Sequence, residues 1–134
     1  MTASPPNASA GRVGLLLSHD LIFTTKIVGT ARGLGFVMLT AGSESQATEL
    51  IEKQRPLAVF VDLSSGSMTG PDAIRAYRKL APEIPFLAFG SHVDMDLLNA
   101  AREAGCDPVL PRSRFASELP ALITRYLGNN GESG

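Results

Sequence analysis

The chain has 134 residues, and 44% of them are hydrophobic, which suits one compact domain. Lys and Arg total 12 against 13 for Asp and Glu, so no broad positive field is expected to attract nucleic acid or an anionic membrane. The only cysteine, Cys106, excludes an internal disulfide bond and a cysteine-based structural metal site. No apolar run approaches the roughly 18 to 20 residues that cross a bilayer. The start of the chain does not resemble a signal peptide, so we expect a cytoplasmic protein that binds neither nucleic acid nor membrane.

The two ends of the chain differ in composition from its middle. Residues 1–11 are mostly small or polar and include two prolines, and they are predicted to be a disordered leader. Residues 12–127 carry the apolar periodicity of a folded domain. Residues 128–134 are rich in Gly and Asn and are predicted to be a disordered tail.

Five short apolar runs are predicted to be β-strands. They are residues 13–17, 35–40, 57–63, 85–89 and 109–110. The third run is the most strand-like, because Val59, Phe60 and Val61 suit a strand that is buried on both faces. Cys106, just before the fifth run, is predicted to be a packed core residue and not a nucleophile.

Helical spacing of apolar residues follows each of these runs. The predicted helices are residues 20–34, 43–53, 71–80 and 94–104, and a last one that begins near Ser117. Ser43 and Gln46 have the spacing of a capping box, and Gly105 is a typical C-terminal stop. Pro120 is compatible with the first turn of the last helix, where a backbone N–H has no helical partner.

Alternating short apolar strands and helices predict an α/β fold, because parallel neighbours need crossover connections. Such a domain has three layers, with a parallel sheet between two layers of helices, and its ligand crevice lies beyond the carboxyl ends of the strands. The residues expected at this crevice are Ser18, His19 and Asp20, then residues 62–68, then Gly90, Ser91 and His92, and finally Pro111, Arg112 and Ser113.

Three segments resemble the receiver domain of response regulators, also called the CheY-like domain. Residues 59–70 are similar to the segment in which a phosphoacceptor Asp ends the third strand and a Met-x-Gly follows. Residues 84–89 resemble the fourth strand of that family, and residues 99–110 resemble its alanine-rich helix and fifth strand. The resemblance covers residues 12–127 in order and spacing. It implies a doubly wound, flavodoxin-like (βα)5 sandwich with strand order 2-1-3-4-5.

The resemblance places Asp62 at the phosphoacceptor position. Receivers also carry two acidic residues after the first strand, which hold Mg²⁺. Here these positions fall on Leu17 with Ser18, or on Ser18 with His19, and only Asp20 is acidic nearby. We therefore expect no cofactor, or at most weak Mg²⁺ binding by Asp20 and Asp62. Two interpretations stay open for Asp62: a nucleophile toward a phosphoryl group, or a carboxylate that is hydrogen-bonded to loop amides and does no chemistry.

The switch positions that the resemblance implies are altered as well. The Ser or Thr at the end of the fourth strand corresponds to Gly90, unless a shift by one residue brings Ser91 into its place. The aromatic residue of the fifth strand corresponds to Val109, and the Lys after that strand corresponds to Arg112, which keeps the charge with a planar geometry. His19 and His92 are interpreted as surface or loop-anchoring residues, because they do not form a recognisable metal motif.

The sequence thus predicts a receiver-like module of two-component (phosphorelay) signalling that is not an enzyme. It is expected to be a pseudo-receiver that acts through protein–protein contacts. The partner would be a kinase, a downstream signalling protein or a second copy of the chain, bound through the fourth helix, fifth strand and fifth helix. Contact residues predicted on this surface are Met95, Arg102, Arg114 and Arg125.

Two alternatives remain. In the first, Asp62 accepts a phosphoryl group, and its added charge shifts a loop equilibrium. In the second, the chain is a small flavodoxin-like hydrolase that uses Asp62, Ser91 and His92, since this architecture supports many chemistries.

Overall fold

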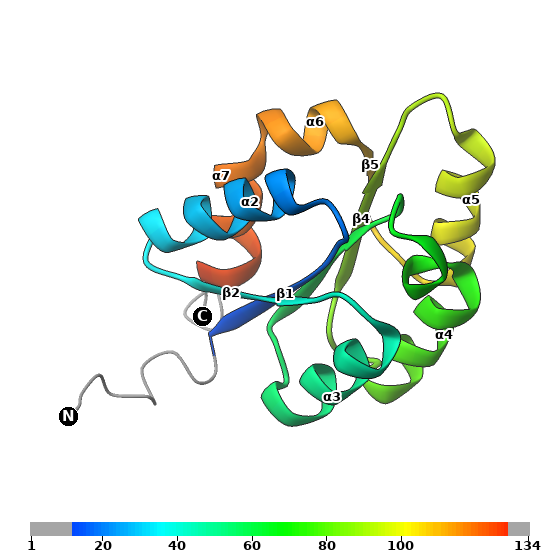
Figure 1. The fold of residues 1–134 in the computed structure, drawn as a ribbon, viewed down its shortest axis with the longest axis horizontal. Helices are drawn as coiled ribbons and strands as arrows, with labels where there is room; N and C mark the ends of the chain where they lie inside the picture. Colours follow the sequence, from blue (N-terminus) through cyan, green and yellow to red (C-terminus); the bar gives the residue numbers. More distant parts are fainter. Residues whose placement is uncertain (1–11, 129–134) are drawn as a thin grey trace.

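A five-stranded parallel sheet forms the centre of the protein in the computed structural model, which describes residues 12–128 (Figure 1). The predicted leader and residues 129–134 of the predicted tail lie outside the described residues. The strands are β1 (Val13–Leu17), β2 (Val37–Ala41), β3 (Ala58–Asp62), β4 (Phe86–Gly90) and β5 (Val109–Pro111). Their order is β2-β1-β3-β4-β5, which confirms the predicted topology.

Helices cover both faces of this sheet, as predicted (Figure 1). One layer holds α3 (Glu44–Gln54), α4 (Pro71–Leu80) and α5 (Met95–Ala104), together with the short 3-10 helix η1 (Gly66–Thr69). The other layer holds α2 (Leu21–Gly33), α6 (Arg112–Ser117), α7 (Leu119–Ile123) and the π-helical segment η2 (Thr124–Gly128). None of the helices within residues 12–128 is long and apolar enough to cross a membrane.

Each face of the sheet has its own core because successive side chains of a strand point to opposite faces. In β1, Leu15 and Leu17 pack toward α3, α4 and α5, whereas Leu16 packs toward α2 and α7. Burial on both faces explains why the strands are nearly continuous apolar runs. Asp62 is the exception in β3, because it is a fully buried carboxylate that ends an otherwise apolar strand.

Capping residues explain where three of the helices begin and where one of them ends. Asp20 caps α2 by accepting a hydrogen bond from the Phe23 N–H, and Asp94 caps α5 in the same way through Leu97. Ser43 caps α3 through the Gln46 N–H, but the Gln46 side chain accepts from the N–H of Gly42 and not from that of Ser43, so the capping box is shifted by one residue. Gly105 ends α5 in the left-handed conformation, with φ of +116°, as predicted.

The second strand begins later than predicted. Gly35 was expected to open it, but Gly35 has φ of +90° and belongs to the turn that follows α2. The Phe36 N–H donates to the Ala31 carbonyl, so the chain still closes the helix at this point. The spacing of Leu34 would put it on the buried face of α2 if the helix continued. Leu34 is instead the C-cap residue and is 41% exposed.

The prediction for the last helix was wrong in its start. Helical structure begins at Arg112, directly after β5, and not near Ser117. It consists of α6 and α7, which meet at Glu118 and not in one continuous helix, and of η2. Pro120 lies in the first turn of α7, where no N–H is needed, whereas a helix continuous with α6 would place it in the interior and lose a hydrogen bond. The early start matters because it places Arg112 at the mouth of the crevice as a helical residue.

Candidate functional site

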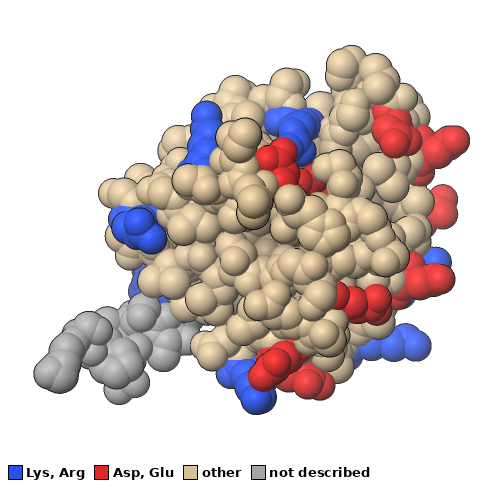
Figure 2. Space-filling model, viewed as in Figure 1, with Lys and Arg blue, Asp and Glu red and all other residues tan. Residues whose placement is uncertain are grey.

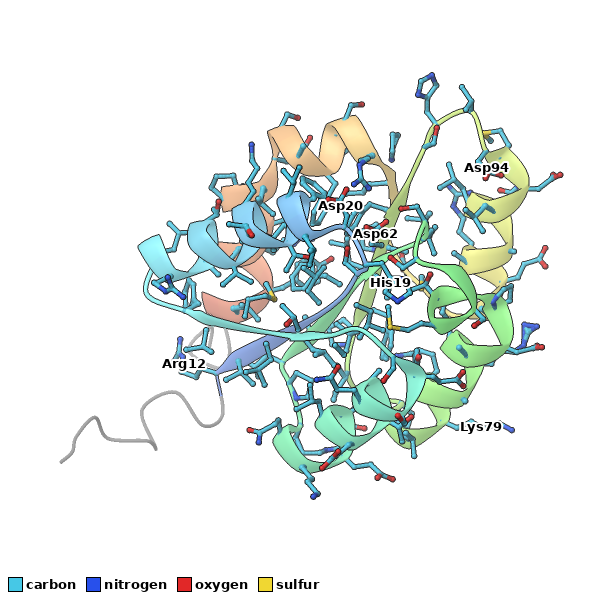
Figure 3. The ribbon with its side chains drawn as sticks, in the orientation of Figure 1. Arg12, His19, Asp20, Asp62, Lys79 and Asp94 are labelled. Carbon is cyan, nitrogen blue, oxygen red and sulfur yellow. The ribbon has the colours of Figure 1, made fainter. Side chains whose placement is uncertain are left out.

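The carboxyl ends of β1 and β3 bring His19, Asp20 and Asp62 together at one edge of the sheet (Figure 3). His19 and Asp20 come from the short connection between β1 and α2, and Asp62 is the last residue of β3. Arg112 joins them as the first residue of α6, because β5 ends at this same edge. The sheet topology alone therefore gathers the predicted crevice residues.

Asp62 is fully buried and hydrogen-bonded at both carboxylate oxygens. Its Oδ1 accepts hydrogen bonds from the backbone N–H of Ser64 at 3.1 Å and from the Ser64 hydroxyl at 2.7 Å. Its Oδ2 accepts a hydrogen bond from the Ser18 hydroxyl at 2.8 Å. The Nη1 of Arg112 donates to Oδ1 at 3.4 Å. An ionised carboxylate has about four acceptor positions, so these contacts satisfy most of its capacity.

Arg112 connects Asp62 to Asp20. Its Nη2 donates to Asp20 Oδ2 at 2.7 Å, while Nη1 of the same guanidinium reaches Asp62. The guanidinium carbon lies 4.5 Å from the centroid of the Phe23 ring and 5.7 Å from that of Phe89. The planar group is thus held by two carboxylates and by two aromatic rings, a combination that Arg favours over Lys.

Ser18 and His19 are the two residues that directly follow β1. Leu17 is fully buried in the core, whereas the Ser18 hydroxyl donates to Asp62. The His19 N–H donates to Ser65 Oγ at 3.0 Å, and His19 Nε2 lies 2.9 Å from the Gly42 carbonyl oxygen. His19 therefore ties three loops together, which agrees with a loop-anchoring histidine.

Gly90 ends β4 in a crowded place. It pairs with Pro111 across the sheet, whereas Ser91 lies beyond the strand, so Gly90 and not Ser91 is the strand-end residue. A Cβ atom at Gly90 would lie 3.2 Å from Leu98 Cδ2 and 3.3 Å from Leu63 Cβ. A hydroxyl-bearing side chain at this position would require Leu63 or Leu98 to move.

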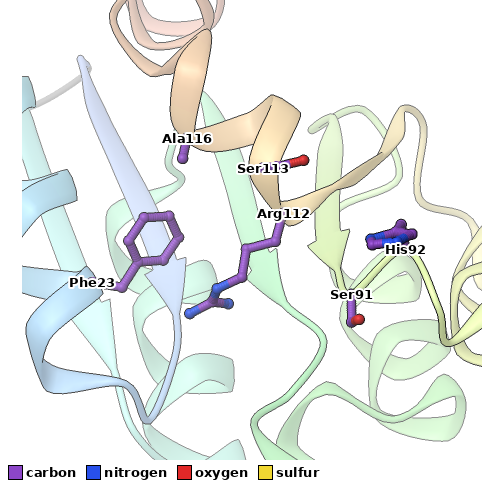
Figure 4. Close-up of a pocket in the computed structure, with 6 residues that line it drawn as sticks. All are labelled: Phe23, Ser91, His92, Arg112, Ser113 and Ala116. Carbon is purple, nitrogen blue, oxygen red and sulfur yellow. The ribbon is translucent and has the colours of Figure 1, made fainter.

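Ser91 and His92 line a surface pocket next to this crevice (Figure 4). The pocket has a volume of about 410 Å³ and is completed by Phe23, Arg112, Ser113 and Ala116. Asp62 does not line it, and within residues 12–128 no hydrogen bond joins Ser91, His92 and Asp62. Ser91 Oγ instead accepts from the Val93 N–H at 3.4 Å. The three residues of the hydrolase alternative are therefore not assembled into a nucleophile and base.

Known proteins with similar sequences are bacterial regulators. No family model matches the chain. It is 24% identical over 121 residues to the transcriptional activator protein ExaE of Pseudomonas putida, and 27% identical over 105 residues to the transcriptional regulatory protein PrrA of Mycobacterium tuberculosis. These alignments cover 88% and 76% of this chain, and 56% and 45% of the relatives. The chain thus spans about half the length of the curated relatives that it matches.

Solved structures with similar folds are receiver domains. The receiver domain of the sensor histidine kinase PA1611 from Pseudomonas aeruginosa has a TM-score of 0.75 at 23% identity, covering 89% of this chain and 99% of that one. A CheY-like receiver domain from Methanospirillum hungatei has a TM-score of 0.77 at 15% identity, covering 92% and 99%. The NtrC4 receiver domain, solved as a beryllofluoride-activated dimer, has a TM-score of 0.70 at 16% identity, covering 86% and 98%.

This chain has the receiver-domain fold. The receiver domain of PA1611 was solved with a magnesium ion in its active-site cleft. In this receiver fold the residues after β1 are Ser18, His19 and Asp20, so a single carboxylate stands where a metal ion would need several oxygen ligands.

Mg²⁺ does not fit the crevice residues as they are arranged. Asp20 uses Oδ1 to cap α2 and Oδ2 to bind Arg112, and Asp62 is engaged at both oxygens. The guanidinium of Arg112 already contacts both carboxylates. Within the described part of the chain, no cluster of three or more His, Cys, Asp or Glu side chains could hold a metal ion.

The structure buries Val109, the residue that the sequence predicts at a switch position of β5, as a small side chain in the core on the face covered by α5. Arg112 does reach Asp62, but at 3.4 Å this is its longer contact, and its shorter contact is to Asp20.

The four predicted partner-surface residues lie on α5, α6 and η2. Met95 is 55% exposed at the start of α5. Arg102 donates to Asn99, Arg114 pairs with Glu118, and the Arg125 guanidinium carbon lies 5.8 Å from the centroid of the Tyr126 ring. Figure 2 shows acidic side chains along the side of the molecule where α5 lies. Asp94, Asp96 and Glu103 are exposed residues of this region.

The sequence analysis did not single out two contacts in the crevice, the hydrogen bonds from Ser64 to Asp62 and the packing of Phe23 against Arg112. Ser64 follows Asp62 by two residues, and an Asp commonly accepts a hydrogen bond from the N–H two positions later, so this contact could have been found. Phe23 lies in the first turn of α2. Its contact with Arg112 depends on the helical start at residue 112, which was not predicted.

Proposed function

We propose that this chain is a receiver-like module of two-component signalling that acts by binding other proteins, with little or no Mg²⁺-dependent phosphorylation of Asp62. The observation that carries the proposal is the state of the Asp62 carboxylate, which is fully buried and bound by Ser18, Ser64 and Arg112. The receiver fold and the regulators among its relatives support a signalling role.

A phosphoacceptor carboxylate needs an oxygen that is free to attack phosphorus. Asp62 Oδ1 has three donors, two from Ser64 and one from Arg112. Oδ2 has the Ser18 hydroxyl at 2.8 Å, in the loop where receivers carry acidic metal ligands. An incoming phosphoryl group would bring negative charge toward Asp20 without a metal ion to offset it. Reaction at Oδ1 would therefore require at least one of its contacts to break, and reaction at Oδ2 would have to use the lone pair that the Ser18 hydroxyl leaves.

Gly90 and Val109 also favour a module that does not respond to phosphorylation. A receiver converts a new charge into a conformational change through groups that respond to it. Gly90 has no hydroxyl that could contact a phosphoryl group, and Val109 is a small buried side chain. Even a phosphorylated Asp62 would lack these two means of moving α5 and β5.

The proposed contact surface consists of α5, β5 and the segment from α6 to η2, with Met95, Arg102, Arg114 and Arg125 as exposed contacts. The NtrC4 receiver domain forms a dimer, which shows that this fold can pair with itself. For this chain the partner would be a second copy, a kinase or a downstream signalling protein, in the cytoplasm. The fully buried Asp62 is not required for any of these contacts.

A phosphorylatable receiver is the second candidate. It is favoured by the position of Asp62 at the end of β3 and by Oδ2, which has one donor where Oδ1 has three. For the hydrolase alternative, no contact between Ser91, His92 and Asp62 offers support, so we do not propose an enzymatic activity.

Intact-mass measurement after incubation with a small-molecule phosphodonor and Mg²⁺ separates the two candidates. The proposed function predicts no phosphoryl adduct on the chain. A receiver domain with an intact acidic pair serves as the control for the reaction conditions. An acid-labile adduct that is absent from Asp62→Asn would refute the proposal and support the phosphorylatable receiver.

A further inference from the structure

We propose that Arg112 is a built-in cation that takes the charge-balancing place of a divalent metal ion in this crevice and thereby makes the fold independent of Mg²⁺. The inference concerns the same site as the proposed function and rests on it in one respect, since both require that Asp62 needs no metal ion. It goes further by assigning Arg112 a specific task, which is to hold Asp20 and Asp62 together as a positioning residue.

Asp62 carries its charge in a fully buried position. Transfer of an ionised carboxylate out of water costs several kcal/mol unless hydrogen bonds and an opposite charge compensate it. Ser18 and Ser64 supply neutral donors, and Arg112 is the one cation that contacts Asp62 among the ion pairs of residues 12–128. Asp20 adds a second negative charge next to the same guanidinium. The crevice therefore needs a positive charge, and Arg112 provides it.

The Arg112 guanidinium is held by two carboxylates and an aromatic ring. Its Nη1 faces Asp62 and its Nη2 faces Asp20, so the two carboxylates lie on neighbouring corners of one planar group. Phe23 stacks against it at 4.5 Å and, in Figure 4, lies on the side of Arg112 opposite Ser91 and His92. Arg112 is the first residue of α6, so the rigid β5–α6 junction sets the direction of its side chain.

Arg112 and a metal ion would compete for the same carboxylate oxygens of Asp20 and Asp62. Mg²⁺ requires oxygen ligands at about 2.0–2.1 Å in octahedral geometry. Asp20 Oδ2 is engaged by Arg112 at 2.7 Å, and the same guanidinium contacts Asp62 Oδ1. A metal ion could use both carboxylates only after the guanidinium had left. Removal of Arg112 is therefore expected to create a weak Mg²⁺ site that the natural chain lacks.

The test is a calorimetric Mg²⁺ titration of the full chain and of Arg112→Met, together with their melting temperatures at equal ionic strength. Met keeps an unbranched apolar side chain near Phe23 and removes the charge. We expect no saturable Mg²⁺ binding and no thermal shift for the natural chain. We expect Arg112→Met to show saturable Mg²⁺ binding at least about tenfold tighter than the detection limit set by the natural chain, a difference of about 1.4 kcal/mol, and to melt at a higher temperature when Mg²⁺ is present.

Arg114→Met is the matched control. Arg114 lies two residues further along α6 and pairs with the exposed Glu118, so its removal changes the net charge equally without opening the crevice. This variant is expected to show no saturable Mg²⁺ binding and no thermal shift in Mg²⁺, like the natural chain. Arg112→Lys covers the case in which Arg112→Met does not fold, because a single ammonium cannot reach both carboxylates in the same way and should leave binding of intermediate strength.

Two results would overturn the inference. One is saturable Mg²⁺ binding, or a higher melting temperature in Mg²⁺, for the natural chain. The other is the absence of any gain in Mg²⁺ binding in both Arg112 variants. A phosphoryl adduct on Asp62 in a natural chain that does not bind Mg²⁺ would refute the proposed function alone. Mg²⁺ binding by the natural chain without an adduct would refute this inference alone.

Discussion

Arg112 is the residue on which the crevice depends most. It forms ion pairs with Asp20 and with the fully buried Asp62, and its own side chain is 34% exposed. Loss of one partner of a buried pair costs about 3–5 kcal/mol, and exposed pairs are worth about 0–1 kcal/mol. Because Arg112 is partly exposed, an intermediate effect is expected.

We predict that Arg112→Met lowers the free energy of unfolding by about 2 kcal/mol in the absence of divalent metal ions, since it leaves Asp62 without a cation. Urea unfolding monitored by circular dichroism measures this difference. The control Arg114→Met removes an exposed ion pair and is predicted to cost less than about 1 kcal/mol. Equal losses in the two variants would show that Arg112 has no special role.

Gly90 permits a second prediction at the residue scale. Gly90→Thr would place a branched side chain against Leu63 and Leu98, whose atoms lie 3.3 and 3.2 Å from the new Cβ. We predict a loss of about 1–3 kcal/mol in unfolding free energy, the usual cost of overpacking a core. In Leu98→Ala, which removes the Cδ2 atom, the same Thr should cost less, and a double-mutant cycle measures this coupling. If the effects simply add, Leu98 does not exclude a side chain at residue 90.

At the scale of elements, Tyr77 ties α4 to the loop that follows β3. Its side chain is fully buried, and its hydroxyl donates to the Met68 carbonyl in η1 at 2.8 Å. Tyr77→Phe keeps the ring and leaves this buried carbonyl without its donor. We predict a loss of about 1–3 kcal/mol in unfolding free energy. Compared with the natural chain, amide hydrogen exchange should become faster in η1 by a larger factor than in β3. Unchanged exchange in η1 would contradict the role of this hydrogen bond.

The last helical segment shows where sequence patterns stop being informative about elements. The strands and the first four helices were found because continuous apolar runs, capping residues and Gly105 act locally. The stretch after β5 has no side-chain cap at its start, and Pro120 suggested a beginning near residue 117. Its start at Arg112 follows from packing, since Phe115 is fully buried against the sheet. Tertiary contacts of this kind do not appear in a local pattern.

The same limit explains which part of the crevice could be predicted. Asp62, Ser18, Gly90 and Arg112 were placed at one edge correctly, because that follows from the parallel topology. The contact between Arg112 and Asp20 joins residues 92 positions apart and depends on side-chain direction at the start of α6. The sequence therefore places these four residues at one edge of the sheet, but it does not predict which crevice residues bind one another.

At the scale of the whole molecule, two buried titratable groups link stability to pH. Burial raises the pKa of the Cys106 thiol from 9.0 to about 12, with Arg78 as a smaller opposing influence, and burial together with the charge of Glu44 raises the pKa of Tyr77 from 10.0 to about 12. Cys106 is almost completely buried, as predicted for a core residue. Both groups favour their neutral form in the folded protein.

We therefore predict that stability falls as the pH rises from about 9 to 12. In this range the unfolded chain releases protons that the folded chain keeps, so the contribution of each group is complete below its unfolded pKa and is lost as the pH rises through its folded pKa. Cys106→Ala should flatten the alkaline part of the stability curve, measured by urea unfolding at successive pH values. A curve of the same slope in Cys106→Ala would show that the thiol does not contribute.

We propose that Asp62 in this receiver fold is not available to a phosphoryl group. Beryllofluoride mimics a phosphoryl group on a carboxylate, so its titration with Mg²⁺ into isotope-labelled protein, followed by amide NMR spectra, tests this without a labile bond. We predict that the amide signals of Asp62, Ser64 and Gly90 do not shift. Saturable shifts of these signals that disappear in Asp62→Asn would show that Asp62 is available.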